Sequence, residues 1–257
     1  MVLFNDENIV GGTFPNGEKY YNKAETFLHD RSDTFTLIFE NNEDIFNLLL
    51  YKKYYDDLVY HTKSNRLKIY FCCYAQMDRP MNDKVFSFKY FAQLINEANF
   101  DAVIIYDPHS RVVERSINKC LIGYPTLPYG YDLYFYPDEG SRAKYSEVYP
   151  NAKYRYGMKK RNLDTGEIIN YEIIADREDI EGKKILIRDD LIIRGGTYKY
   201  AAKALREMGA AQVDLYITHT MPSAKEFYEN LKENGIDNYY TANTLRLPWI
   251  KQESIKF

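Results

Sequence analysis

Residues 183–205, KKILIRDDLIIRGGTYKYAAKAL, place two adjacent acids close to a pair of glycines. The run 184–188 is apolar apart from its ends, which indicates a buried central strand. Asp189 and Asp190 are expected where this strand emerges. There, their carboxylates could accept hydrogen bonds from sugar hydroxyls or approach a metal ion.

The residues that follow these acids have the types that hold a phosphate. Gly195 and Gly196 let the backbone come close to a ligand and adopt positive φ. Thr197 is expected to be the N-cap of a helix, whose positive end favours an anion. Taken alone, the stretch is explained equally well as an ordinary strand–helix turn with solvated acids.

Short aliphatic runs alternate with helical spacing along the chain, which indicates a mainly parallel α/β sheet. Strands are expected at 66–74, 101–107, 183–190 and 212–220, with another ending in the acids and glycine of 131–140. Helices are expected from Phe88, after Thr197 with a stop at Gly209, and over 224–235. Acids at the carboxyl ends of such strands lie where open α/β sheets bind ligands.

Two other segments organise the chain. The prolines and glycines of 122–132 indicate a boundary between two halves. The charged, irregular stretch 157–172 is expected to form a mobile loop or a hairpin.

Composition excludes several classes of partner. The 257 residues suffice for one large α/β domain or two smaller ones. A net charge of −3 provides no general attraction for nucleic acid, and no apolar run is long enough to cross a membrane. The three irregularly spaced cysteines, Cys72, Cys73 and Cys120, suggest reduced thiols and a cytoplasmic location.

The stretch 189–197 resembles the ribose-phosphate loop of the type I phosphoribosyltransferase fold, whose usual form is two acids, two aliphatics, Asp-Thr, two small residues and Thr. Further segments resemble one branch of that fold, the ribose-phosphate pyrophosphokinase family, and occur in its order. They are FPNGE (14–18), YAQMDRP (74–80), YDPH (106–109), YPDEGSRAKY (136–145, similar to a Pro-Asp-x-Gly-Gly turn) and MKKR (158–161). The resemblance covers nearly the whole chain. It implies an α/β protein of two tandem type I phosphoribosyltransferase-like domains, 1–125 and 126–257, each a mainly parallel sheet flanked by helices.

The resemblance also implies an activity: transfer of the β,γ-diphosphoryl group of ATP to the anomeric hydroxyl of a ribose 5-phosphate compound, with release of AMP. The ATP site would comprise Phe14, Asn16, Glu18, Gln76, Asp78, Arg79 and His109. The catalytic residues would be Lys159, Arg161, Asp189 and Asp190. The ribose phosphate would be bound by Asp189, Asp190, Arg194, Gly195, Gly196 and Thr197. Mg²⁺ would be held with the help of Asp107, His109 and Asp138. Because the family builds its nucleotide site across subunits, at least a homodimer is expected.

Three departures from the family pattern bear on function. Gln76 and Met77 replace an Arg-Gln pair near the nucleotide, and Asn16 replaces an Asp in the adenine loop. Ile193 and Arg194 replace Asp-Thr, so the phosphate loop loses a carboxylate and gains a guanidinium. A 5′-diphosphate, as in ADP-ribose, would use this additional donor. The acceptor is therefore expected to be either ribose 5-phosphate or ADP-ribose, unless Arg194 faces solvent or a subunit interface.

Two other functions remain open. A phosphoribosyltransferase could use a ribose 1-pyrophosphate on the same fold, although it would not need the ATP-type segments 14–18 and 106–109. A non-catalytic regulatory homologue would explain Gln76 and Met77. The retained Lys159 and the paired acids indicate an active enzyme instead.

Overall fold

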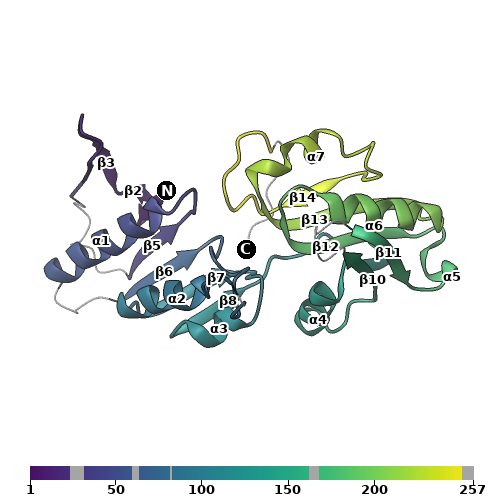
Figure 1. The fold of residues 1–257 in the computed structure, drawn as a ribbon, viewed down its shortest axis with the longest axis horizontal. Helices are drawn as coiled ribbons and strands as arrows, with labels where there is room; N and C mark the ends of the chain where they lie inside the picture. The colour runs from purple at the N-terminus through teal and green to yellow at the C-terminus, as the bar shows by residue number, and fades with distance from the viewer. Residues whose placement is uncertain (24–31, 60–63, 82, 162–167, 251–257) are drawn as a thin grey trace. The chain divides into compact units, whose positions relative to one another are not determined.

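The computed structural model describes residues 1–23, 32–59, 64–81, 83–161 and 168–250; the side chains at 160–161 and 168–169 are not part of that description. The chain divides into two compact units, Met1–Gly123 and Tyr124–Phe257. In Figure 1 the first unit runs from purple to teal and the second from teal-green to yellow.

The N-terminal unit is built on a six-stranded sheet with the order β2-β1-β5-β6-β7-β8. The strands from β5 to β8 are parallel, whereas β1 and β2 add an antiparallel edge. Their bounds are β1 Val2–Phe4, β2 Glu7–Asn8, β5 Asp33–Leu37, β6 Asn65–Ile69, β7 Ala102–Tyr106 and β8 Cys120–Gly123. A separate hairpin pairs β3 Val10–Thr13 with β4 Lys19–Tyr21, and the helices are α1 Glu43–Leu58, α2 Ser87–Glu97 and α3 Val112–Ser116.

Helix α2 forms because its apolar residues recur at helical spacing. Phe88, Phe91 and Ile95 are buried, as the spacing predicts, together with Ala92, whereas Leu94 of the predicted apolar face is 43% exposed. The predicted strand at 66–74 is too long, because β6 ends at Ile69. The chain then enters turns that include Tyr74 at a φ of 62°, a left-handed conformation that ends an extended strand.

The C-terminal unit contains a second six-stranded sheet with the order β11-β10-β9-β12-β13-β14. All neighbours are parallel except β10 and β11, which form an antiparallel hairpin. The bounds are β9 Leu133–Tyr136, β10 Tyr154–Arg161, β11 Ile168–Ile174, β12 Lys184–Ile192, β13 Gln212–Thr220 and β14 Tyr239–Thr241. The helices are α4 Glu139–Val148, α5 Arg177–Ile180, α6 Gly196–Glu207, a 3₁₀ turn at Pro222–Ala224 and α7 Lys225–Glu229.

Both sheets are mainly parallel and carry helices, which confirms the predicted fold class. In the C-terminal unit, β13 has the predicted bounds of 212–220. The hairpin β10–β11 confirms one of the two alternatives for 157–172, while 162–167 lie outside the described residues. The helix predicted at 224–235 is wrong over its second half: α7 ends at Glu229, and turns then lead to Gly235 at a φ of 82°.

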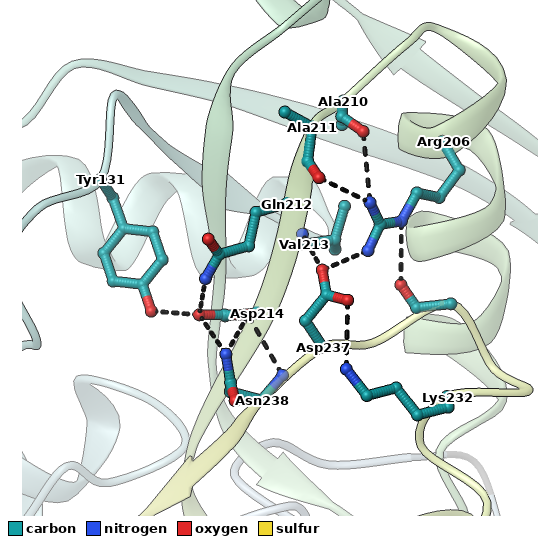
Figure 2. A network of polar contacts seen from close by, with 11 residues as sticks. Tyr131, Arg206, Ala210, Ala211, Gln212, Val213, Asp214, Lys232, Asp237 and Asn238 are labelled. Carbon is teal, nitrogen blue, oxygen red and sulfur yellow. Dashed lines mark hydrogen bonds and ion pairs between the residues drawn. The ribbon is translucent and has the colours of Figure 1, made fainter.

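A polar network lies at the end of the C-terminal sheet where β13 begins (Figure 2). Asp214 is fully buried and accepts hydrogen bonds from Tyr131 Oη, from Gln212 Nε2 at 2.8 Å and from the backbone N–H of Asn238 at 3.1 Å. A buried carboxylate is stable only with such donors. Because β12 and β13 are parallel, this network lies at the end of the sheet opposite the carboxyl ends of these strands.

Asp237 anchors the neighbouring part of this network. It accepts hydrogen bonds from the backbone N–H of Val213 at 2.9 Å, from Lys232 Nζ at 3.3 Å and from Arg206 Nη2. Burial acts to raise the pKa of Asp237, but these donors and the two cations outweigh it, so the pKa lies below its usual value. The carboxylate therefore stabilises the fold at neutral pH, and this contribution is lost as the pH falls through the lowered pKa.

We predict that Asp237→Asn lowers the free energy of unfolding at pH 7 by about 1–2 kcal/mol, because charged hydrogen bonds are replaced by weaker ones. The difference from wild type should shrink in acid, where the wild-type carboxyl is protonated. Urea unfolding at neutral and acidic pH measures both effects. Glu233→Gln is the matched control, because Glu233 is exposed. Equal losses in the two variants would contradict the role of the network.

Candidate functional site

The candidate site in the C-terminal unit is built on β12, which lies between β9 and β13 in the sheet. Asp189 and Asp190 lie within this strand, whereas the prediction placed them at its end, because Leu191 and Ile192 continue the pairing with β13. The two carboxyl groups lie close together, and a side-chain hydrogen bond joins Asp190 to Asp189.

Asp189 is surrounded by hydrogen-bonding groups. Its Oδ1 lies 2.7 Å from Ser141 Oγ and accepts a hydrogen bond from the Asp190 N–H at 2.9 Å. Its Oδ2 lies 2.9 Å from the hydroxyl of Tyr198, which also lies 2.7 Å from the carbonyl oxygen of Leu191. Burial, and then the charge of Asp190, raise the pKa of Asp189 to about 7. The pKa of Asp189 therefore lies well above that of an ordinary carboxyl group.

Asp138 connects the surroundings of Asp189 to hairpin β10–β11. Asp138 precedes α4 and accepts a hydrogen bond from the N–H of Ser141 at 2.9 Å, which makes it the N-cap of that helix. Its other oxygen pairs with Lys159 Nζ of β10. Burial alone would raise the pKa of Asp138, but Lys159 and Ser141 lower it below its usual value. Ser141 thus joins Asp138 and Asp189, two acids far apart in the sequence.

Arg188 holds the backbone of β12 beneath the acids. Its side chain is fully buried, with the guanidinium 4.2 Å from the ring centre of Tyr145 and 4.6 Å from that of Tyr216. It donates to Thr218 Oγ1 at 3.0 Å and to the carbonyl oxygen of Asp189. Desolvated cation–π contacts of this kind contribute about 2 kcal/mol. The sequence reading missed this residue, although a charge inside an apolar strand was its available signal.

Helix α6 begins at Gly196, and the loop before it depends on Gly195. Gly195 has a φ of 85°, and a β-carbon there would lie 2.2 Å from the ring of Phe227. The prediction that Thr197 is the N-cap is wrong: Gly195 occupies that position, so Thr197 lies inside the first turn. The amides of Gly196 and Thr197 have no acceptor within the helix and lie at its positive end, so they suit an anion.

The loop side chains lie at the surface. Arg194 is exposed, and the neighbouring Ile193 is 45% exposed. The carbonyl oxygen of Ile193 accepts a hydrogen bond from Ser223 Oγ at 2.7 Å, which holds the loop backbone. Arg194 is therefore accessible to a ligand, as the prediction requires, and also to solvent.

We predict that Gly195→Ala lowers the stability of the C-terminal unit by about 1–3 kcal/mol, because the methyl group meets Phe227 in a strained conformation. Gly196→Ala is the matched control: nothing lies within 4 Å of its β-carbon position, and it lies in the helix. Chemical unfolding of both variants measures the difference. If both changes are tolerated equally, Gly195 does not impose the geometry of the loop.

The predicted ATP-site residues lie in the N-terminal unit. The segment 14–18 joins β3 to β4: Phe14 is 52% exposed and packs on Tyr20, and Asn16 Oδ1 accepts a hydrogen bond from the N–H of Glu18 at 3.2 Å. After β6, Gln76 and Arg79 are exposed while Asp78 is half-buried. After β7, Asp107 is fully buried with a φ of 41°, and His109 is exposed. Their roles in nucleotide binding stay predictions.

The predicted metal ligands belong to both units: Asp107 and His109 to the N-terminal unit and Asp138 to the C-terminal unit. Within the described ranges of the chain, no group of three or more His, Cys, Asp or Glu side chains is placed to hold a metal ion. Mg²⁺ usually takes only one or two protein ligands and completes its shell with water and substrate phosphates. His109 is exposed, and Asp138 is engaged by Lys159 and Ser141. Arg161 lies in β10, but its side chain lies outside the description.

Comparison with known proteins places this site in a class. Residues 152–246 match the phosphoribosyl transferase domain family, and this range includes β12, the loop and α6. A crystal structure of phosphoribosylpyrophosphate synthetase from Mycobacterium smegmatis has a similar fold, with a TM-score of 0.71. The match covers 97% of this chain and 86% of the synthetase chain, at 19% sequence identity. The fold is therefore similar to that of this synthetase, with a phosphoribosyltransferase-like domain in the C-terminal unit.

Curated relatives define the group more closely. A ribose-phosphate pyrophosphokinase of Sulfurisphaera tokodaii is 27% identical over 247 residues, which is 90% of this chain and 82% of the relative. That of Saccharolobus solfataricus is 25% identical over 91% of this chain and 83% of its own length. That of Caldanaerobacter subterraneus is 32% identical over 68% of this chain and 58% of its own. This protein is a homologue of the ribose-phosphate pyrophosphokinases, as the sequence resemblance predicts.

No helix in the described part of the chain is both long and apolar enough to cross a membrane.

Proposed function

We propose that this protein transfers the β,γ-diphosphoryl group of ATP to the anomeric hydroxyl of a ribose 5-phosphate compound and releases AMP. The observation that carries this proposal is the extent of the similarity to proteins named ribose-phosphate pyrophosphokinase. It spans 90% of the chain and so includes the N-terminal unit. A transferase acting on a ribose 1-pyrophosphate would need only the C-terminal type of domain.

The C-terminal unit supports the acceptor half of this reaction. The amides at the start of α6 would bind the 5′-phosphate, and the acids of β12 would bind the ribose hydroxyls. Both ligand groups would then lie at the carboxyl ends of parallel strands, where sheets of this kind bind their ligands. This arrangement would hold the anomeric hydroxyl in position for an in-line transfer.

Lys159 and Arg161 would act on the group being transferred. Phosphoryl transfer requires alignment and neutralisation of negative charge more than covalent help from the protein. Lys159 is paired with Asp138 in this structure, so the phosphates would replace Asp138 as its partner. Mg²⁺, held with the help of His109, would supply further neutralisation of the ATP phosphates.

The acceptor depends on what Arg194 contacts. Because its side chain is exposed beside the phosphate loop, it could bind the second phosphate of ADP-ribose. Ribose 5-phosphate has no group there, so it would gain less from this guanidinium. We therefore retain both compounds as acceptors, together with the expectation that the protein acts as at least a homodimer.

The direct test is AMP release from Mg–ATP with ribose 5-phosphate or ADP-ribose as acceptor. We expect AMP with at least one acceptor, and Lys159→Ala should reduce the rate by about 100-fold or more because a charge-stabilising contact is lost. Circular dichroism would check that this variant folds. Absence of AMP with both acceptors would contradict the proposal and favour a non-catalytic homologue. Release of pyrophosphate from a ribose 1-pyrophosphate would identify a transferase.

Arg194→Thr distinguishes the acceptors. If Arg194 binds a 5′-diphosphate, the variant should raise the KM for ADP-ribose by about tenfold or more and change that for ribose 5-phosphate less. Arg177→Thr is the control, because it removes an exposed guanidinium from α5, away from the phosphate loop. Equal changes with both acceptors would exclude Arg194 as a 5′-diphosphate contact.

A further inference from the structure

Two side chains join hairpin β10–β11 to the turn that precedes α4. Lys159 of β10 pairs with the carboxylate of Asp138. Tyr171 of β11 donates a hydrogen bond to the carbonyl oxygen of Pro137 at 3.0 Å. Because Pro137 and Asp138 are adjacent in the sequence, both strands of the hairpin are attached to one turn.

Lys159 and Tyr171 are also partners within the hairpin. They lie directly opposite each other in the antiparallel register of β10 and β11. The side chains of two directly opposite residues lie on the same face of such a pair, with their β-carbons about 5 Å apart. The place of Lys159 on the turn is therefore tied to that of Tyr171.

Gly157 leaves the space that the phenol of Tyr171 occupies. A β-carbon at Gly157 would lie 2.2 Å from Tyr171 Oη and 2.6 Å from the ring carbon that carries this oxygen. A side chain at position 157 would thus displace the hydroxyl from its place. A glycine within a strand often marks such a close approach of another group to the backbone.

The hydroxyl of Tyr171 keeps its proton at neutral pH. Burial, and then the charges of Asp138 and Asp189, raise the pKa of Tyr171 above its ordinary value. A protonated phenol can donate to a carbonyl oxygen, whereas a phenolate cannot. The bond to Pro137 is therefore available throughout the pH range in which enzymes of this kind are assayed.

We propose that Tyr171 is a positioning residue that holds hairpin β10–β11 against the 137–138 turn and thereby fixes Lys159 in the candidate site. Tyr171 would then affect turnover through Lys159 and not through contact with a substrate. The role of Lys159 in the reaction rests on the proposed function. The attachment of the hairpin rests on the contacts within the C-terminal unit.

The first experiment needs no substrate. Tyr171→Phe removes only the hydroxyl, and we expect an amine-reactive acetyl ester to modify Lys159 about fivefold faster, because the loss of one hydrogen bond weakens the pairing with Asp138. Peptide mass spectrometry measures this rate, with the exposed Lys203 of α6 as the internal reference. Tyr200→Phe is the matched control, since Tyr200 is 46% exposed on α6. An unchanged rate at Lys159 in Tyr171→Phe would overturn the proposal.

The second experiment separates kcat from KM for AMP release. Tyr171→Phe should lower kcat about fivefold to tenfold and change the KM values for ATP and the acceptor less than twofold, because only a contact of the transition state is affected. The loss should disappear in a Lys159→Ala background, where no ammonium group remains to be positioned. Equal losses with and without Lys159 would show that Tyr171 only stabilises the fold.

Gly157→Ala tests the same contact from the other strand. Its methyl group should displace the phenol and reproduce the loss of kcat. Adding Tyr171→Phe to this variant should lower kcat little further, because both changes break the same hydrogen bond. Additive losses would contradict a shared contact, and circular dichroism would check that each variant folds.

The experiments distinguish this inference from the proposed function. If the wild-type protein releases no AMP with either acceptor, the proposed function fails. The acetylation experiment then still decides whether Tyr171 fixes the position of Lys159.

Discussion

The C-terminal unit is organised around the cost of burying two adjacent carboxyl groups in its central strand. Asp189 and Asp190 are 8% and 7% exposed. Burial of a charged group is unfavourable unless hydrogen bonds or opposite charges compensate for it. Ser141 and Tyr198 provide such bonds to Asp189, and Arg188 lies directly beneath, bonded to its carbonyl oxygen. These contacts link the first turns of α4 and α6 to β12.

The two ends of the C-terminal sheet carry different groups of polar residues. At the end where β13 begins, Asp214 and Asp237 are surrounded by donors that join β13, β14 and α6 (Figure 2). At the other end, the acids, the Gly195 loop and the start of α6 present groups suited to a sugar phosphate. The groups suited to a ligand thus lie at the carboxyl ends of the parallel strands, where sheets of this kind bind their ligands.

The similarity to ribose-phosphate pyrophosphokinases extends over both units. Individual residues of the candidate site nevertheless differ from the family pattern. The exposed Arg194 changes the charge of the phosphate loop. The hydroxyl of Ser141 connects Asp138, and through it Lys159, to Asp189. Fold and family do not determine which acceptor is used, because specificity depends on such individual contacts.

The sequence alone determined the features that depend on local pattern. The spacing of apolar residues gave α2 and β13, and the aliphatic run before two acids gave β12. The order of short motifs indicated the family. These signals are readable because periodicity and turn chemistry act over a few neighbouring residues.

Only the tertiary structure decided which groups surround Asp189. Ser141 lies 48 positions before Asp189 in the sequence, and Tyr198 lies 9 positions after it. No local pattern indicates that their hydroxyls meet one carboxyl group. The helix start at Gly195 likewise depends on Phe227, which follows much later in the chain. The opening pair of acids was visible in the sequence, but the hydrogen bonds that hold Asp189 come from packing across β12, α4 and α6.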